Sequence, residues 1–515
     1  MPTLELFTAA AANAGYVLLA ALIILCGYRA LLHPLRSYPG PLLAKVTSLY
    51  AGSATVKKSL HLQILKDHEK YGSVVRLAPN RLVFNTVTAW RGIYQSEQII
   101  KAYTYHSTSK DFRVNMFSER DQAAHRTKRK LIGQVLTERS MRSFEPAMTE
   151  QISVYLSQIR DASQNSTPVN MTEKARHLAL DVVGQLAFGH DLNVQTHPNN
   201  RFIMGAMSFS TFRLNMYMQM DFMSYLEPTF LLNWLVKEAR QKYWLWLQHM
   251  IKTRMGEEKN ARSDFYSVVA DTLDAEPDTL NGGNMWSEAV FFMSAGGDTV
   301  ATLIAATFFY LSRNPECYRK LAGEIRSTFL SGSDVRGGPQ MASCTYLRAC
   351  IDETLRMSPP SASNHWREQD PADSRPLIID GHVIPRGTLV SVSPYALQHN
   401  EAYFPDPFTF KPERWIEGDE EARKIAHDAF SAFSTGPRNC AGKAMAYLES
   451  SLVIAKTLWY FDFEAAPGHL GRVGGGTPGA KDGRDKPGEY QILDVFTARH
   501  DGPYLVFRPR DNEFK

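Results

Sequence analysis

The chain has 515 residues, 44% of them hydrophobic, and a formal net charge of +4. This hydrophobic content supports a large buried core, and so small a charge on so long a chain does not suggest a nucleic-acid-binding surface. Five scattered cysteines do not make a disulfide framework, so we predict a reducing environment for most of the chain.

The first feature in chain order is an uncharged apolar run from Leu6 to Tyr28. As a helix it is long enough to cross a bilayer core of ~30 Å. Glu5 precedes the run and Arg29 and Arg36 follow it, so the positive-inside rule places residues 1–5 in the lumen and the rest of the chain in the cytosol. A cleaved signal peptide is the alternative, but no Lys or Arg precedes this run, which exceeds the ~7–15 apolar residues of such a signal.

Residues 29–41 follow as a proline-rich linker that disfavours helix. We predict that residues 42–515 form one domain. Within it, Val74 to Phe84 is expected to fold as two short strands joined by a turn, and residues 496–498 are expected to pair with residues 505–507 as a terminal hairpin.

A basic stretch covers residues 121–130. His125 and Arg129 are four residues apart, so they share one face if the stretch is helical. Arg126, Lys128 and Lys130 point elsewhere and could belong to a surface that docks an acidic protein. The alternative is an ordinary solvated basic helix.

Residues 201–230 are rich in methionine and aromatic side chains, with six of the 18 methionines between Met204 and Met223. Such side chains make a soft apolar surface that adapts to irregular ligands. Ordinary core packing is the alternative for any single residue of this stretch.

Met285 to Leu311 is predicted to form a long apolar helix, which contains the sequence Ala-Gly-Gly-Asp298-Thr299. Two adjacent glycines inside a helix cost up to ~2 kcal/mol relative to alanine. We therefore expect the backbone to open there or another segment to press close. The acid beside an alcohol, Asp298 and Thr299, can relay protons through water.

Glu353 and Arg356 lie three residues apart in a short predicted helix. Most such pairs are exposed and contribute little to stability. A second segment, Pro-Glu-Arg414-Trp, follows later in the chain. Between them, residues 361–364 and His365 precede Arg367, and a lone histidine such as His365 is more often packed or on the surface than a ligand.

The cysteine loop runs from Phe433 through Gly436, Arg438 and Cys440 to Gly442, and a strongly periodic helix follows it. Cys440 therefore lies at or just before a helix N-terminus, where a thiolate is favoured over a thiol. One thiolate without a second Cys or His nearby is a poor zinc site, but it can serve as an axial ligand of haem iron.

At every fixed position this loop matches the haem-binding signature of the cytochrome P-450 family, F-x-x-G-x-R-x-C-x-G. The glycine-containing helix matches the family motif A/G-G-x-D/E-T-T/S except at Val300, and the E-x-x-R and P-E-R segments match as well. The chain thus resembles this family, and in its anchor and linker it resembles the fungal microsomal members. The resemblance implies a mainly α fold with a minor β region, preceded by one N-terminal transmembrane helix.

The resemblance also implies roles for individual residues. Cys440 is expected to be the axial ligand of the iron of haem b. The other expected haem-binding residues are His125, Arg129, Arg367, Arg438, Phe433, Gly436 and Gly442. Asp298 and Thr299 are expected to be catalytic, and a buried network of Glu353, Arg356 and Arg414 is expected to support the haem from behind.

The function implied is a monooxygenase on the cytosolic face of the endoplasmic reticulum membrane that hydroxylates or epoxidises a hydrophobic small molecule, in fungal secondary metabolism. The chain has no flavin or nicotinamide fingerprint, so electrons are expected from NADPH through a separate reductase, with cytochrome b5 as a possible second donor. Two alternatives stay open. One is an oxygen-independent haem-thiolate isomerase or dehydratase, against which the Asp298–Thr299 pair argues, and the other is a non-catalytic haem-binding protein.

Overall fold

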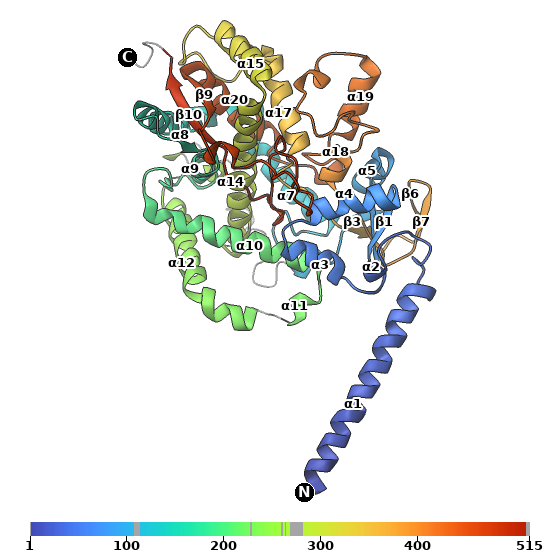
Figure 1. The fold of residues 1–515 in the computed structure, drawn as a ribbon. Helices are drawn as coiled ribbons and strands as arrows, with labels where there is room; N and C mark the ends of the chain where they lie inside the picture. Colours follow the sequence, from blue (N-terminus) through green and yellow to red (C-terminus); the bar gives the residue numbers. More distant parts are fainter. Residues whose placement is uncertain are drawn as a thin grey trace.

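The computed structural model describes residues 2–107, 114–226, 229–258, 261–262, 264–267 and 282–510. The predicted lumenal segment begins at residue 1 and the predicted domain ends at residue 515, and residue 1 and residues 511–515 lie outside the described residues. Residues 227 and 228 of the methionine-rich stretch also lie outside them. Helices dominate the described part, and the sheet strands β1, β3, β6 and β7 gather on the side from which the N-terminal helix projects (Figure 1). The predicted mainly α fold with a minor β region is confirmed.

The described helices are α1 (Pro2–Gly27), α2 (Leu42–Val46), α3 (Leu49–Val56), α4 (Leu60–Tyr71), α5 (Val87–Tyr94), α6 (Thr104–Ser107), α7 (Gln122–Val135), α8 (Glu138–Gln164), α9 (Met171–Phe188) and α10 (Phe202–Gln219). The chain continues with α11 (Met223–Leu226), α12 (Thr229–Met255), α14 (Gly282–Arg313), α15 (Pro315–Thr328), α16 (Pro339–Ser343), α17 (Thr345–Met357), α18 (Pro394–Gln398), α19 (Glu420–Ala429) and α20 (Lys443–Tyr460).

The strands form three sheets. The largest has the order β1 (Val74–Ala78), β2 (Arg81–Phe84), β8 (Leu389–Val392), β5 (Arg367–Gln369) and β3 (Ile99–Lys101). A second sheet has the order β4 (Val169–Asn170), β10 (Tyr504–Pro509) and β9 (Phe461–Ala465), and β6 (Leu377–Ile379) pairs with β7 (His382–Ile384).

The strand predictions met different outcomes. β1 and β2 form the expected antiparallel pair, with Val74 opposite Phe84. The terminal hairpin is wrong, because β10 pairs with β9 and β4 rather than with residues 496–498. Those residues lie instead in a segment closed by a single bridge between Leu493 and Arg499.

The N-terminal helix stands away from the body of the molecule (Figure 1). It continues past the predicted end at Tyr28 as a π-helix, Tyr28–Leu32, so the N-terminal stretch that is long and apolar enough to cross a membrane is Ala11–Leu32. A second such stretch in the described residues, Phe291–Arg313, is mostly buried in the body. The N-terminal helix ends where His33 becomes extended before Pro34, because a residue preceding proline is disfavoured in helical conformation. Across this break, Arg29 Nη1 of the π-helix donates a hydrogen bond of 2.7 Å to the carbonyl of Val46, which ties the helix end to α2.

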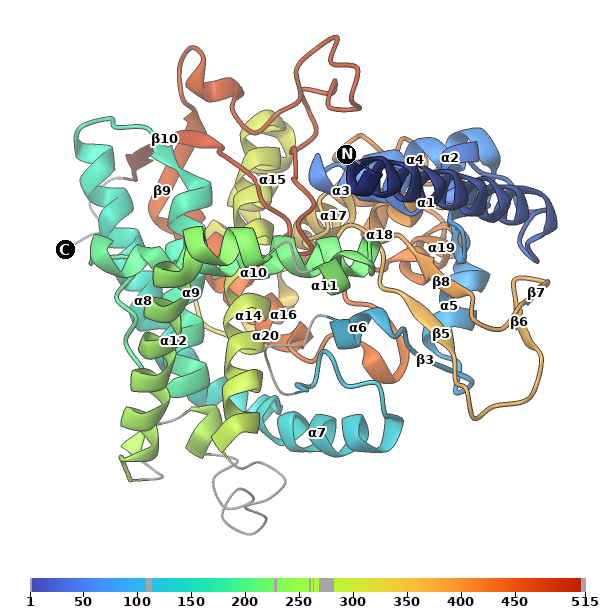
Figure 2. The same ribbon diagram turned by 90° about the horizontal axis from the view of Figure 1, so that it is seen from below.

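The centre of the body is α14, and in the view from below it crosses the molecule between α9 and α17 (Figure 2). Its two glycines lie where α9 presses close: a Cβ at Gly296 would lie 2.8 Å from Val183, and one at Gly297 would lie 2.6 Å from Leu180. The glycine pair therefore serves close helix packing, which is one of the two outcomes expected for it.

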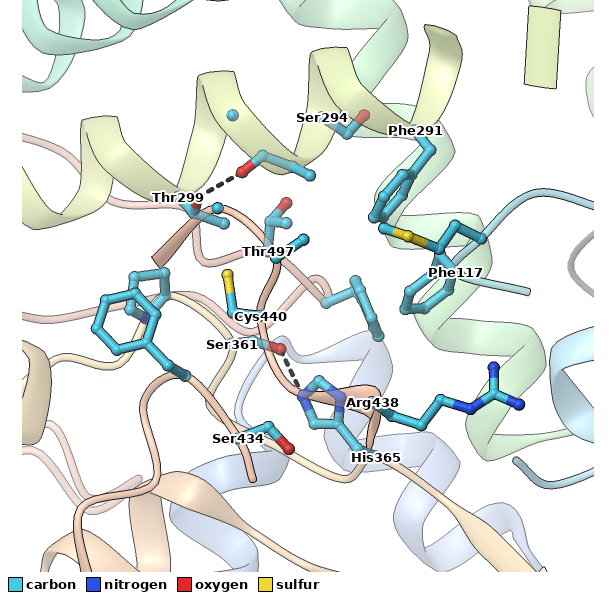
Figure 3. A pocket seen from close by; sticks show the side chains of 18 of the residues that line it. Phe117, Phe291, Ser294, Thr299, Ser361, His365, Ser434, Arg438, Cys440 and Thr497 are labelled. Atoms are coloured by element: carbon cyan, nitrogen blue, oxygen red, sulfur yellow. Dashed lines mark hydrogen bonds between the residues drawn. The ribbon is translucent and has the colours of Figure 1, made fainter. Parts of the chain in front are cut away.

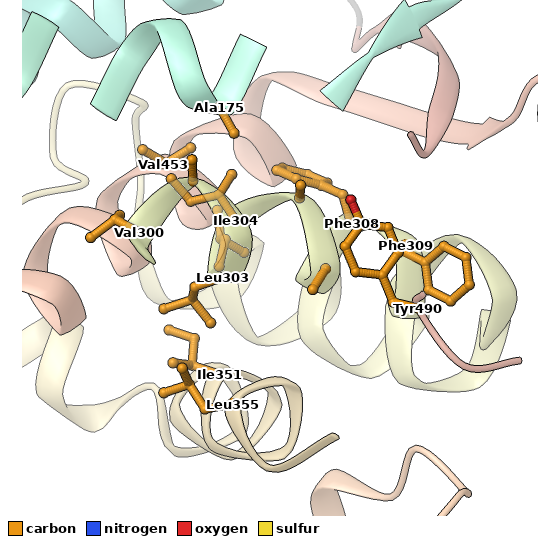
Figure 4. Packing of buried hydrophobic residues seen from close by; sticks show 14 of the residues in the cluster. Ala175, Val300, Leu303, Ile304, Phe308, Phe309, Ile351, Leu355, Val453 and Tyr490 are labelled. Carbon is orange, nitrogen blue, oxygen red and sulfur yellow. The ribbon is translucent and has the colours of Figure 1, made fainter. Parts of the chain in front are cut away.

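Beyond the glycines, α14 is buried by side chains from several helices, as Figure 4 shows. Leu303 and Ile304 pack with Ile351 and Leu355 of α17 and with Val453 of α20. Each of these side chains is at most 2% exposed. This packing fixes the position of the helix that carries Asp298 and Thr299.

Candidate active site

The cysteine loop is closed by its own backbone. The N–H of Cys440 donates to the carbonyl of Phe433 at 2.8 Å, and α20 begins three residues later. Gly436 has φ +72°, and a Cβ there would lie 2.1 Å from the carbonyl oxygen of Tyr94. Only glycine fits this position, and the result is a loop that presents the Cys440 thiol to a cavity (Figure 3).

The helix N-terminus was expected to favour a thiolate at Cys440. In the chain without its ligand, desolvation of the thiol inside the cavity raises the pKa of Cys440. The N–H of Gly442 and the charges of Arg129 and Lys443 act in the opposite direction but do not outweigh burial. A metal ion deprotonates a thiol that coordinates it, so an iron bound here would hold this sulfur as a thiolate.

Seven basic side chains line the same cavity. Arg213 and His365 are two of them, and we call the other five the basic cluster: Lys101, His125, Arg129, Arg367 and Arg438. They come from β3, α7, β5 and the cysteine loop. Lys101 and Arg367 stand directly opposite each other across the β3–β5 pair, an arrangement of like charges that destabilises a sheet.

The positive charges of the basic cluster outnumber the carboxylates near them. Burial, together with the neighbouring cations, lowers the pKa of Lys101 well below its usual value, that of His125 to about 3 and that of Arg438 to about 10. The nearby carboxylates of Glu119 and Glu288 do not offset these charges, and both also lie within 4.0 Å of Lys128. Such a cluster fits an anionic ligand.

Haem fits this donor set, because its two propionates supply the missing negative charges. Arg438 already donates to the carbonyls of Glu119 and Arg120, and Arg129 donates to the Asn439 carbonyl beside Cys440, so both side chains are held in place. A Cβ at Gly442 would meet nothing within 4 Å, which leaves open space beside the thiol for a flat ligand.

The structure separates the two residues predicted to be catalytic. Thr299 lines the cavity, and its hydroxyl donates to the carbonyl of Ala295 at 2.5 Å. Asp298 is buried on the other side of α14, where Arg176 Nε donates to its Oδ1 at 2.8 Å. Its Oδ2 accepts from the hydroxyl of Thr497 at 3.4 Å, and Thr497 lines the cavity. Asp298 therefore communicates with the cavity through Thr497.

The structure brings Glu353, Arg356 and Arg414 together. Arg356 donates to both oxygens of Glu353 at 2.9 Å, and Arg414 Nε donates to Oε1 at 3.1 Å. Glu353 and Arg356 are completely buried. Burial alone would raise the pKa of Glu353, but the two guanidinium groups and the N–H of Lys411 hold it below its usual value.

This network is linked to the cysteine loop through Gln398. Arg356 Nη1 donates to the carbonyl of Gln398 at 2.8 Å, and the side-chain oxygen of Gln398 accepts from the N–H of Ser431 at 2.8 Å. Ser431 is two residues before Phe433, so the network braces the start of the loop.

The described structure adds cavity residues that the sequence did not single out. Lys101, Phe117, Thr497 and Phe496 line the cavity together with His365, which the sequence favoured as a packed or surface residue. No local motif marks the first four, because their positions depend on pairing between distant segments.

Two of the weaker expectations change. On α7, Arg126 and Lys130 are exposed, but Lys128 turns inward, donates to the carbonyl of Val114 at 2.5 Å and lies 3.4 Å from Glu288. On α10, the cavity is lined by Ser210, Thr211, Arg213, Leu214 and Tyr217 rather than by methionines. Met207 and Met218 are instead buried in the core.

Comparison with known proteins gives consistent matches. The Cytochrome P450 family model matches residues 39–470. "Cytochrome P450 monooxygenase AKT7" of Alternaria alternata is 34% identical over an alignment that covers 96% of this chain and 95% of the relative. "Cytochrome P450 monooxygenase apf7" of Gibberella fujikuroi is 33% identical and covers 96% and 97%, and "Cytochrome P450 monooxygenase poxM" of Penicillium oxalicum is 33% identical and covers 93% and 91%.

Proposed function

Because the chain belongs to the cytochrome P450 family and is a monooxygenase of that family, we propose that it hydroxylates or epoxidises a hydrophobic small molecule with oxygen from O2. The observation that carries this proposal is a single cavity lined by the Cys440 thiol, the basic cluster and Thr299. The relatives are fungal monooxygenases, and for this chain we propose a role in fungal secondary metabolism.

The proposed cofactor is haem b, whose iron Cys440 would hold and whose propionates the basic cluster would bind. When bound, a thiolate-ligated haem supplies the activation of O2 and the cleavage of the O–O bond. Phe433, Gly436 and Gly442 shape the loop that places the sulfur. Glu353, Arg356 and Arg414 hold the start of that loop through Gln398.

The chain's own part in the chemistry is the supply of protons. Arg176 holds Oδ1 of Asp298, which leaves Oδ2 directed at the Thr497 hydroxyl. The Thr497 hydroxyl donates to Oδ2 and can at the same time accept a hydrogen bond from a water molecule in the cavity, because a hydroxyl group is both a donor and an acceptor, so it would link the Asp298 carboxylate to that water. The Thr299 hydroxyl faces the same cavity and can hold a water molecule on this route.

We place the enzyme in the endoplasmic reticulum membrane, with a single span at Ala11–Leu32 and the catalytic domain in the cytosol. Electrons come from NADPH through a separate cytochrome P450 reductase on the same membrane, and cytochrome b5 is a second candidate donor. The exposed Arg126 and Lys130 of α7 suit the acidic surface of such a partner.

The test is to express the full chain with a reductase and to record the spectrum of the reduced protein under carbon monoxide. We expect the red-shifted Soret band of a thiolate-ligated haem, and we expect Cys440→Ala to lose it. With NADPH and reductase, a monooxygenase consumes O2 in a substrate-dependent way. Turnover without O2 would instead indicate an isomerase or dehydratase, and haem binding without any turnover would indicate a carrier.

A further inference from the structure

The cavity has an aromatic wall made by three phenylalanines. The ring of Phe117 stacks on that of Phe291, with centroids 5.7 Å apart at 19°, and meets that of Phe496 edge-on at 5.1 Å. They come from the loop before α7, from α14 and from the C-terminal segment, and Figure 3 shows Phe117 and Phe291 side by side. Such a wall favours flat unsaturated rings, which stack on it or meet it edge-on.

The wall is fixed at one end by hydrogen bonds to its backbone. The N–H of Met116, next to Phe117, donates to Glu288 of α14 at 2.8 Å, and Lys128 donates to the carbonyl of Val114 at 2.5 Å. The loop that carries Phe117 is therefore held against the helix that carries Phe291.

At the other end of the wall, Phe496 is held by hydrogen bonds in a strained backbone conformation. Phe496 has φ +82°, a conformation that a bulky side chain rarely adopts. It is held there by its N–H, which donates to Asp494 at 3.3 Å, and by the N–H of Ala498, which donates to the carbonyl of Pro360 at 2.7 Å. Strain of this kind persists only where the surroundings impose it, and here it turns the ring of Phe496 onto Phe117.

A polar pair continues the wall. The ring of His365 lies 5.7 Å from that of Phe496, and its Nε2 lies 2.9 Å from the hydroxyl of Ser361 (Figure 3). Tyr94 donates to the carbonyl of His365 at 3.0 Å and fixes its backbone. Both side chains line the cavity.

The polar pair is uncharged at neutral pH. Burial, followed by the charges of Arg367 and Lys101, lowers the pKa of His365 to about 3. A neutral imidazole has one donor and one acceptor nitrogen, so with Ser361 it can bind a hydroxyl, carbonyl or amide group but offers no charge to an acid. The other cation on this lining, Arg213, packs over the ring of Tyr217 at 5.5 Å.

We propose that the cavity binds a flat, uncharged, aromatic or polyunsaturated substrate that carries a hydroxyl, carbonyl or amide group. Phe117, Phe291 and Phe496 contact its ring system, and Ser361 and His365 bind its polar group. This inference rests on the proposed function, because it names the substrate class of that same site.

The test is a calorimetric titration of the haem-loaded enzyme, because heat reports binding whether or not the iron changes its spin state. Four matched probes separate the features: 2-naphthalenemethanol, 2-methylnaphthalene without the hydroxyl, decahydro-2-naphthalenemethanol without the flat ring, and 2-naphthoate with a charge. We expect the aromatic alcohol to bind on the order of five-fold more tightly than the hydrocarbon, as one neutral hydrogen bond predicts. The saturated alcohol and the acid are expected to bind more weakly than the aromatic alcohol.

Variants assign the effect to the polar pair. His365→Leu is expected to remove the preference for the alcohol over the hydrocarbon, and His365→Gln, which keeps a donor and an acceptor, is expected to restore part of it. His469→Leu changes an exposed histidine far along the chain and is expected to change nothing.

The proposal is overturned if His365→Leu keeps the preference, if the naphthoate binds more tightly than the alcohol, or if none of the four probes binds. The carbon monoxide spectrum of each variant separates this failure from a failure of the proposed function. If the thiolate band is normal but the enzyme prefers none of the probes, only the proposed substrate class is contradicted. If the band is missing in the unaltered chain, the proposed function is contradicted.

Discussion

The molecule buries two groups of charges that differ in how they are balanced. In the Glu353 network, Arg356 and Arg414 both donate to one carboxylate, whose pKa stays below its usual value in spite of burial. In the basic cluster, Lys101 and Arg367 face each other across two strands, and the pKa of Lys101 falls well below its usual value.

The difference indicates what each group is for. A buried ion pair whose hydrogen bonds are satisfied is complete within the chain, and removing one member leaves a buried charge without a partner. A buried group of like charges is complete only when a ligand brings the opposite charge. The first group should therefore govern folding, and the second should govern binding of the cofactor.

The largest expected effect comes from breaking the balanced group. Arg356→Ala strands the buried carboxylate of Glu353, so we expect the free energy of unfolding to fall by ~3–5 kcal/mol, with or without haem. Denaturant unfolding of the haem-free and haem-loaded protein measures this loss.

The chain offers a matched control for this variant. Glu316 and Arg319 form a pair with the same spacing, 3.3 Å apart, but their side chains are 82% and 69% exposed. Arg319→Ala should therefore cost no more than ~1 kcal/mol. If both variants lower the free energy of unfolding by the same amount, the Glu353 network does not act as a buried network.

The sequence predicted the balanced group because its members lie in local motifs. Glu353 and Arg356 are one helical turn apart, and Arg414 follows in a recognisable segment. The same local signals predicted α14, α20 and the β1–β2 pair. They could not predict that α14 would need its glycines for α9, although they allowed for a close approach.

The sequence could not predict the whole basic cluster, because the missing member is placed by strand register. Lys101 reaches the cavity only because β3 pairs with β5 and sets it opposite Arg367. In the same way, the partners Arg176 and Thr497 of Asp298 come from α9 and from the C-terminal segment. Contacts of this kind join segments far apart in the chain, and no local pattern records them.

The pH dependence of stability separates the two groups further. The pKa of His125 is about 3 in the folded chain and about 6.5 in the unfolded chain, so the unfolded state binds one more proton between these values. The contribution of His125 to the free energy of unfolding is therefore fully present above pH 6.5. It is lost as the pH falls below that value, at up to about 1.4 kcal/mol per pH unit. Glu353, with a lowered pKa, loses its contribution only at a more acidic pH, below its usual value of 4.5.

The measurement is the free energy of unfolding between pH 6.5 and pH 5 for the haem-free chain and for His125→Gln. We expect the free energy of unfolding to depend less steeply on pH in the variant, by the equivalent of up to one bound proton. The other buried histidines contribute equally to both proteins. Haem propionates should raise the pKa of His125 and make the slope of the loaded protein shallower too. Identical slopes in all three samples would mean that His125 does not belong to an unbalanced cluster.

The smallest expected effect is also the one that separates folding from binding most directly. Lys101→Met removes a cation that is buried beside other cations, so we expect the haem-free protein to become slightly more stable. The same change removes a charge near the anionic ligand, so we expect haem affinity to fall roughly ten-fold, the loss of about 1.5 kcal/mol that a charged hydrogen bond represents. Unfolding of the haem-free chain and transfer of haem to an excess of an acceptor protein measure the two effects. Lys130→Met is the matched control, because it makes the same replacement at an exposed position of α7, and it should change neither the stability nor the haem affinity.

If Lys101→Met weakens both folding and haem binding, Lys101 is a structural residue, and the contrast between the two groups of charges fails at this position.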